Sequence, residues 1–108
     1  MRLLGSEARR HIAEVEMVDK DGNKVMARMG SKVDLLPVEM QNFDDDDKMG
    51  TFKYFAQQEY RENRQLFGEG PFVITELVEW PCGRVVVHFE IPKFDSYGGG
   101  PSTKFVVV

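Results

Sequence analysis

The sequence lacks the marks of disulfide-bonded, membrane-spanning and exported proteins. Cys82 is the only cysteine, which excludes a disulfide within the chain and favours a reducing compartment, the cytoplasm. No apolar run approaches the roughly 20 residues that a membrane-spanning helix needs, so we expect no membrane association. Residues 1–7 lack the apolar stretch of a signal peptide, and we therefore expect no export.

Positive charge is also scarce. The chain has 14 Lys and Arg against 18 Asp and Glu, a net charge of −4. The whole deficit lies in residues 31–47, which carry one basic and six acidic residues. The remainder is close to neutral and shows no basic stripe. Duplex nucleic acid is bound largely through neutralised phosphates, so this charge pattern argues against a duplex-binding surface.

What the sequence does contain is a pattern of short strands. Its 108 residues suffice for one domain with a real core. Residues 1–10 show no periodicity, and we expect them to be flexible. Residues 11–29 alternate between apolar and polar side chains on both sides of Asp-Lys-Asp-Gly-Asn at 19–23, which predicts a β-hairpin.

The middle of the chain predicts a strand, a loop and the only helix. Residues 32–37 form a short strand that ends at proline, and residues 38–50 form a loop. Residues 51–67 predict a helix, with Thr51 as its N-cap and Gly68 just beyond its end. Helical spacing places six apolar side chains on one face, which is the predicted packing face: Phe52, Phe55, Ala56, Tyr60, Leu66 and Phe67.

The last third predicts three more strands. Residues 72–80 and 84–91 are rich in valine and aromatic residues, and Pro81-Cys82-Gly83 supplies the turn between them. Residues 97–101 predict a flexible glycine loop, and residues 105–108 a closing strand. The order predicts a single mainly β (α+β) domain. We expect a small, partly open antiparallel β-barrel with an N-terminal hairpin and one inserted helix.

Three segments resemble small β-barrels of the Src-homology-3-like type, an outline shared by many small bacterial and phage proteins. SKVDLLP at 31–37 resembles their first strand, GPFVITELVEWPCGRVVVHFE at 70–90 their central hairpin, and GPSTKFVVV at 100–108 their final short turn and closing strand. The chain departs from them in its N-terminal hairpin and in having an acidic stretch plus helix for the first long loop. Such barrels host protein binding, RNA binding and occasionally toxins, so the resemblance implies a fold and not an activity.

The four consecutive aspartates Asp44, Asp45, Asp46 and Asp47 are the most unusual feature. A calcium loop starting at Asp45 would need a glutamate at its twelfth position, where the chain has Ala56, so the spacing argues against calcium. Two interpretations remain: bait for a basic partner, or a solvated loop whose charge favours the following helix N-terminus.

The same run, followed by Lys48, is the recognition sequence of enteropeptidase, which is often built into expression linkers. No polyhistidine tract accompanies it, and the predicted strand at 32–37, which the barrel needs, precedes it. We therefore interpret it as native.

No other motif forms a catalytic or metal-binding set. His11, Cys82 and His88 are the only soft ligands, fewer than the four of a structural zinc site. Cys82 lies at a predicted hairpin tip, six residues from His88, too far for a nucleophilic pair. Residues 98–104 place lysine after the hydroxyl residues, the reverse of a phosphate-binding loop. We expect no catalytic residues, no metal and no cofactor.

Several side chains at unusual positions remain as candidate contacts. Glu59 and Asn63 fall within the predicted apolar face of the helix. Either a buried carboxylate acts here as a general acid or a specificity contact, or the helix packs along the barrel rim and leaves this stretch partly wet or bonded to backbone. Tyr54 on the opposite side of the helix, Trp80 beside a turn and Tyr97 in the glycine loop are candidate binding aromatics.

These observations favour a non-enzymatic, intracellular protein-binding module, of the kind that serves as a phage or bacterial regulatory or accessory protein. Its contact surface would be the acidic loop together with the side of the helix that carries Lys53 and Tyr54. The acidic loop favours a basic partner. The alternative is a nucleic-acid-associated small β-barrel with four contact residues: Trp80, Arg84, Tyr97 and Lys104. An enzyme with a site near Glu59 is the third hypothesis.

Enteropeptidase tests the acidic run directly. If the aspartates form an exposed loop, the protease should cut the folded protein after Lys48, as detected by mass spectrometry, and a Lys48→Ala variant should stay intact. Cleavage only after denaturation would show that the aspartates are tied down, and it would contradict both the loop and the bait interpretations.

Overall fold

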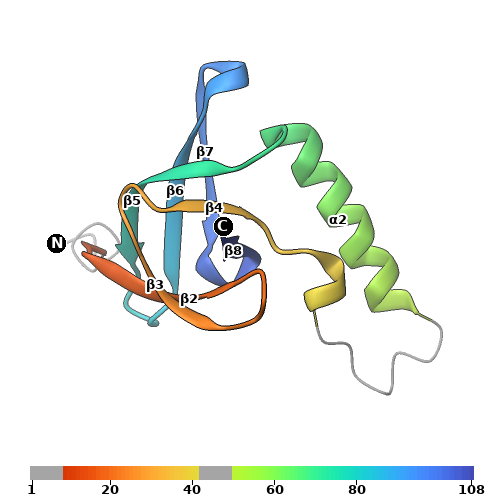
Figure 1. The fold of residues 1–108 in the computed structure, drawn as a ribbon, viewed down its shortest axis with the longest axis horizontal. Coiled ribbons are helices and arrows are strands. Elements are labelled where there is room, and N and C mark those ends of the chain that lie inside the picture. The colour runs from red at the N-terminus through yellow and green to blue at the C-terminus, as the bar shows by residue number, and fades with distance from the viewer. Residues whose placement is uncertain (1–8, 42–49) are drawn as a thin grey trace, which may run out of the picture.

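The computed structural model describes residues 9–41 and 50–108. Within these ranges, eight strands form one mixed sheet that is not closed, accompanied by one α-helix (Figure 1). The elements are β1 (Arg10–His11), β2 (Glu14–Asp19), β3 (Lys24–Arg28), β4 (Lys32–Leu35), η1 (Val38–Met40), α2 (Thr51–Phe67), β5 (Phe72–Glu79), β6 (Val85–Ile91), η2 (Pro92–Phe94), β7 (Ser96–Pro101), η3 (Ser102–Lys104) and β8 (Phe105–Val107).

The sheet has the order β3-β2-β8-β4-β5-β6-β7, and β1 pairs with β5 outside this path. The N-terminal hairpin joins the sheet by laying β2 parallel to β8, with Val18 opposite Val106. The prediction of an antiparallel barrel is therefore wrong in this respect, because this pair makes the sheet mixed. All other pairs are antiparallel. The mainly β, α+β class is confirmed.

The two predicted hairpin turns are confirmed, and they share one geometry. The N–H of Gly22 donates to the carbonyl of Asp19 (3.1 Å), and the N–H of Gly83 donates to that of Trp80 (2.8 Å). Both glycines have left-handed backbones, with φ of 84° and 88°. This is the type I turn followed by a left-handed glycine that commonly closes three-residue hairpin loops.

The glycine-rich segment is not the predicted loop at 97–101 but strand β7, paired along its length with β6. Its glycines are needed because neighbours lie directly on the strand. A Cβ on Gly98 would lie 2.9 Å from atoms of Phe67 and Ile91, and one on Gly99 would lie 2.5 Å from the Val87 carbonyl oxygen. Close packing therefore selects glycine here, where the sequence pattern indicated flexibility.

The first residues also differ from expectation. Arg10 and His11 form β1, which pairs with Glu79 and Val78 of β5, so the predicted flexible segment 1–10 reaches too far. Residues 1–8 lie outside the described part of the chain. The sheet therefore holds the chain from Arg10 onward.

The core lies on the inner side of the curved sheet, and aromatic rings form its centre. The ring of Phe89 stacks on Phe72, with centroids 4.7 Å apart and planes at 20°. Phe67 and Phe105 each meet Phe89 edge-on at 5.3 Å. Aliphatic side chains surround the rings: Met17, Ala27, Val33, Leu35, Ile74, Leu77, Val87 and Ile91.

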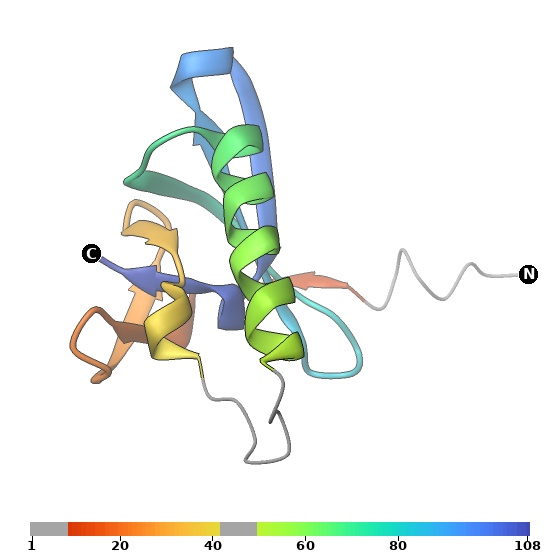
Figure 2. The ribbon, with the colours of Figure 1, turned by 90° about the vertical axis from the view of Figure 1, so that its right-hand side faces the viewer.

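Helix α2 runs along one side of the sheet, in front of the β6–β7 hairpin when that side faces the viewer (Figure 2). Its predicted bounds and its end at Gly68 are confirmed. Thr51 is not the N-cap, however: Gly50 takes that position in a left-handed conformation (φ 68°), and no side chain caps the helix. In residues 9–41 and 50–108, no helix is long and apolar enough to cross a membrane.

The glycines of β7 give a stability test. We expect Gly98→Ala and Gly99→Ala each to lower the free energy of unfolding by roughly 1–3 kcal/mol, because the added methyl group would overpack the site. Gly100→Ala should be milder, since its nearest contact, a Phe105 ring carbon, is 3.2 Å away. Urea unfolding followed by circular dichroism measures all three. Neutral or stabilising effects at all three positions would indicate a flexible loop.

Candidate functional site

The C-terminal half of α2 is the part that is fastened to the sheet. Phe67 packs against the core, and the Arg64 guanidinium donates to three acceptors: the Asp34 carboxylate (3.0 Å), the Gly68 carbonyl (3.1 Å) and the Tyr60 hydroxyl (2.8 Å). Burial works to lower the pKa of Arg64, but the hydrogen bonds to Tyr60 and Asp34 outweigh it, and the pKa is raised. Arg64 therefore stays charged and links helix to β4.

These contacts set the rotation of the helix, and they correct the predicted packing face. Phe52, Phe55 and Leu66 are 62%, 58% and 65% exposed, and no residue of α2 is fully buried. The residues with partly buried side chains lie on an adjacent face: Ala56, Tyr60, Asn63, Arg64 and Phe67. The strongest apolar side chains of the helix thus lie outside the core, because Phe67 and Arg64 decide which face turns inward.

An outer stripe of α2 is the candidate functional site. It consists of Phe52, Phe55, Glu59, Glu62 and Leu66, whose spacings of three and four residues place them on one side of the helix. All five side chains are exposed. The stripe is therefore apolar at both ends and acidic in its middle.

Tyr54 lies next to the stripe. It is 59% exposed, and its ring meets that of Phe55 edge-on with centroids 5.7 Å apart. The aspartates at 44–47, the other part of the predicted contact surface, lie outside the described residues.

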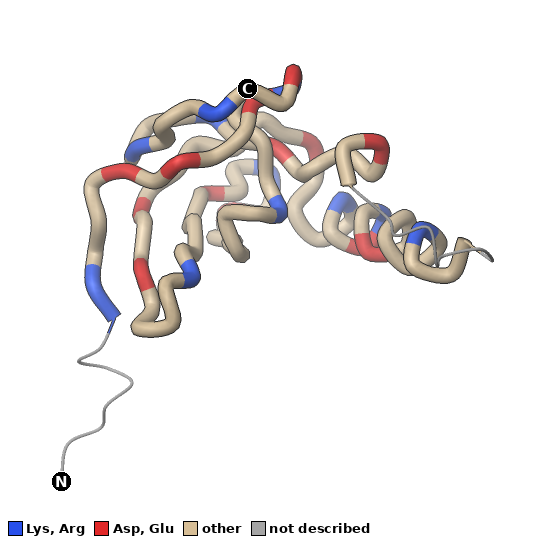
Figure 3. The backbone as a smooth tube through the Cα atoms, turned by 90° about the horizontal axis from the view of Figure 1, so that it is seen from below, with Lys and Arg blue, Asp and Glu red and all other residues tan. Residues whose placement is uncertain are grey.

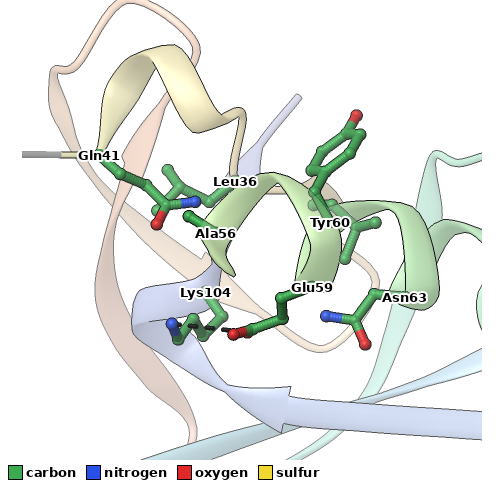
Figure 4. Close-up of a pocket in the computed structure, with 8 residues that line it drawn as sticks. Leu36, Gln41, Ala56, Glu59, Tyr60, Asn63 and Lys104 are labelled. Atoms are coloured by element: carbon green, nitrogen blue, oxygen red, sulfur yellow. Dashed lines mark ion pairs between the residues drawn. The ribbon is translucent and has the colours of Figure 1, made fainter. Parts of the chain in front are cut away.

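Glu59 and Asn63 do not form a buried pair. The side chain of Glu59 is 54% exposed, and its carboxylate lies 3.6 Å from the Lys104 ammonium of η3. Figure 4 shows these two groups facing each other beside Asn63. They line a hollow of about 20 Å³, which has room for roughly one water molecule. Eight residues line the hollow: Leu35, Leu36, Gln41, Ala56, Glu59, Tyr60, Asn63 and Lys104. The helix follows the sheet here with these polar side chains exposed or partly exposed, in agreement with the second interpretation.

The four residues predicted for a nucleic-acid surface do not come together. Trp80 and Arg84 share the β5–β6 turn, where the backbone N–H of Trp80 donates to the backbone carbonyl of Arg84 (2.9 Å). Lys104 is instead paired with Glu59 beside α2. Tyr97, 74% exposed, lies opposite Glu90 near the other end of the β6–β7 pair.

Sequence reasoning missed two arginines that matter. Arg64 has a local signal, because Tyr60 lies four residues before it on the same side of the helix. Arg9 has none, since its guanidinium reaches Trp80, 71 residues later, and lies 5.0 Å above that ring. Both signs of charge are spread over the described backbone (Figure 3).

The soft ligands are dispersed. Cys82 is exposed in the β5–β6 turn, and His11 contacts the carboxylate of Glu76. Among the described residues, no group of three His, Cys, Asp or Glu side chains is placed to hold a metal ion. No protein-family model matches the chain, and no curated protein or solved structure matches it at a significant level.

The Arg64–Asp34 link yields a double-mutant test. Both side chains are 26% exposed. Arg64→Met should therefore leave the partly buried Asp34 carboxylate without its cation and lower the free energy of unfolding by about 2 kcal/mol. Combining it with Asp34→Asn should reveal a coupling energy of about 1 kcal/mol or more. The exposed pair Lys24–Glu16, at 3.9 Å, serves as control and should show coupling below about 0.5 kcal/mol. Equal coupling in the two pairs would contradict the anchoring role.

Proposed function

We propose that this protein is a non-enzymatic protein-binding module that docks a basic, amphipathic segment of a partner protein on the outer stripe of α2. The exposure of Phe52, Phe55 and Leu66, on a helix whose C-terminal half is fastened to the sheet, carries the proposal. Large apolar side chains gathered on one exposed face are typical of interaction sites. The alternating three- and four-residue spacing suits a helical partner lying along α2.

The charge of the stripe favours a basic partner over a second copy of the chain. Glu59 and Glu62 occupy its middle, and no Lys or Arg belongs to it, although Lys104 of η3 lies 3.6 Å from the Glu59 carboxylate. Two copies packed antiparallel would bring the glutamates of one against those of the other, which is repulsive. In the sequence, the aspartates at 44–47 precede the helix by only a few residues and would add to the attraction of a cation.

The surroundings of Glu59 support a binding role rather than an enzymatic one. Its carboxylate is exposed and paired with Lys104, and the hollow beside it holds about 20 Å³. A general acid or base also needs room for a substrate beside it, and this hollow has room for only about one water molecule.

We also propose that the barrel is of the Src-homology-3-like type. The segment that resembles the first strand of these barrels, β4, pairs with the closing strand β8 on one side and with β5 on the other. The segment that resembles the central hairpin is the β5–β6 pair, and the short turn η3 precedes the last strand. This neighbour order supports the likeness.

Photo-cross-linking tests the docking surface. With benzoylphenylalanine at position 55, the protein should form a discrete adduct with one partner in its native cells, whereas the same group at Val73, 44% exposed on β5, should not. Phe52→Ser with Phe55→Ser should abolish the adduct, and Met29→Ser, which removes a 63% exposed side chain elsewhere, should leave it unchanged. Replacing Asp44 to Asp47 by asparagine should weaken capture and make it less sensitive to salt.

The purified partner then decides between the alternatives. Its binding should weaken at least tenfold with the double serine variant, while the thermal midpoint of that variant stays within a few degrees of the parent. Cross-linking of the chain to itself, with dimers lost in the serine variant, would identify a second copy as occupant. Adducts at positions 55 and 73 alike, or none at either, would overturn the proposal.

A further inference from the structure

A second surface surrounds Trp80, on the opposite side of the molecule from α2. In Figure 1 the β5–β6 turn (cyan) lies across the sheet from the helix. The indole, 37% exposed, lines two hollows at once, and Val86 lines both. The first hollow, of about 420 Å³, includes Arg9, Arg10 and His88, and the second, of about 620 Å³, includes Arg84.

Cationic groups dominate the surroundings of the indole, although the chain as a whole is acidic. The Arg9 guanidinium lies 5.0 Å above the ring centroid. Two carboxylates are near, but each has a partner: Glu79 accepts from Arg10 (2.7 Å), and Glu76 contacts His11. Within residues 9–41 and 50–108, neither Arg9 nor Arg84 forms an ion pair. Two guanidinium groups that have no ion-pair partner among the described residues therefore line the hollows on which one exposed aromatic ring borders.

We infer that this surface binds single-stranded nucleic acid, with one base stacked on the part of the Trp80 ring that the Arg9 guanidinium leaves uncovered and with adjacent phosphates bound by Arg9 and Arg84. An aromatic face accepts any base, and guanidinium groups bind phosphate oxygens in a forked geometry. Each hollow has the size of a small-ligand site, enough for a base and its sugar. A duplex is disfavoured because its bases are not free to stack and the patch offers few cations.

The surface around Trp80 is separate from the α2 stripe. No residue of the stripe lines either hollow around Trp80, and no residue of these hollows belongs to the stripe. Loss of one activity should therefore leave the other intact, and the two proposals can fail separately.

The only tryptophan of the chain is the ring proposed to stack, so its fluorescence reports binding directly. An eight-residue oligothymidylate at low salt should quench it, and the dissociation constant should rise with salt with a log–log slope of about 1.4, corresponding to two phosphate contacts. An abasic strand of equal length should bind roughly tenfold more weakly. A duplex and an oligoglutamate peptide serve as further probes.

Variants assign the roles, with binding measured by anisotropy of a labelled strand. Trp80→Ala should weaken binding roughly tenfold or more, whereas Trp80→Phe, which keeps a stacking ring, should lose only a few-fold. Arg84→Ala should lower the salt slope by about 0.7. Arg28→Ala, which removes an exposed arginine paired with Glu14 at 3.2 Å on the edge strand, should change neither quantity.

Several outcomes would overturn the inference. Absence of quenching by the single strand at low salt would remove it, as would equal affinity for the duplex or for the abasic strand. Oligoglutamate that binds as tightly as the single strand would identify an acidic peptide as the ligand. Circular dichroism of every variant separates loss of binding from loss of folding, and the abasic strand together with the salt slope of Arg84→Ala keeps the test decisive if Trp80→Ala fails to fold.

Discussion

The packing of aromatic rings around Phe89 holds the distant parts of this chain together. Its ring, on β6, is stacked against Phe72 and met edge-on by Phe67 from the end of α2 and by Phe105 from β8. Each buried phenylalanine contributes roughly 1.5–3 kcal/mol through the removal of apolar surface from water, and edge-on and stacked rings add a directional preference. Because Phe105 is fixed in this way, β8 is held where the N-terminal hairpin can pair with it through Val18.

The same cluster determines what the helix presents to solvent. Phe67 draws the last turn of α2 into the core, and Arg64 fixes the turn before it through Asp34. No residue of the first turns is buried, and the two phenylalanines at 52 and 55 remain exposed. The apolar side chains of the outer stripe are thus exposed because the contacts that anchor the helix lie on a different face, near its C-terminal end. This is the physical basis for proposing the stripe as a docking site.

The net charge does not show that the molecule has two surfaces of different charge. The outer stripe of α2 carries two glutamates, of which Glu59 is paired with Lys104. The hollows beside the Trp80 indole, on the other side, include two guanidinium groups without ion-pair partners among the described residues. The charge deficit lies in residues 31–47 and does not reveal these two surfaces. We propose that they have opposite preferences, one for a basic protein segment and one for a single-stranded nucleic acid.

The sequence by itself determined the features that depend on local chemistry. Gly22 and Gly83 mark both hairpin turns because each needs a left-handed residue, and the pattern at 51–67 marks a helix because its periodicity and its terminal Gly68 are local. Only the tertiary structure decided which face of that helix is buried, that the glycines of β7 form a strand, and that β2 runs parallel to β8. Each of these depends on contacts between residues far apart in the chain. Hydrophobic periodicity and turn propensity are local, so they do not predict which distant ring or strand a residue will contact.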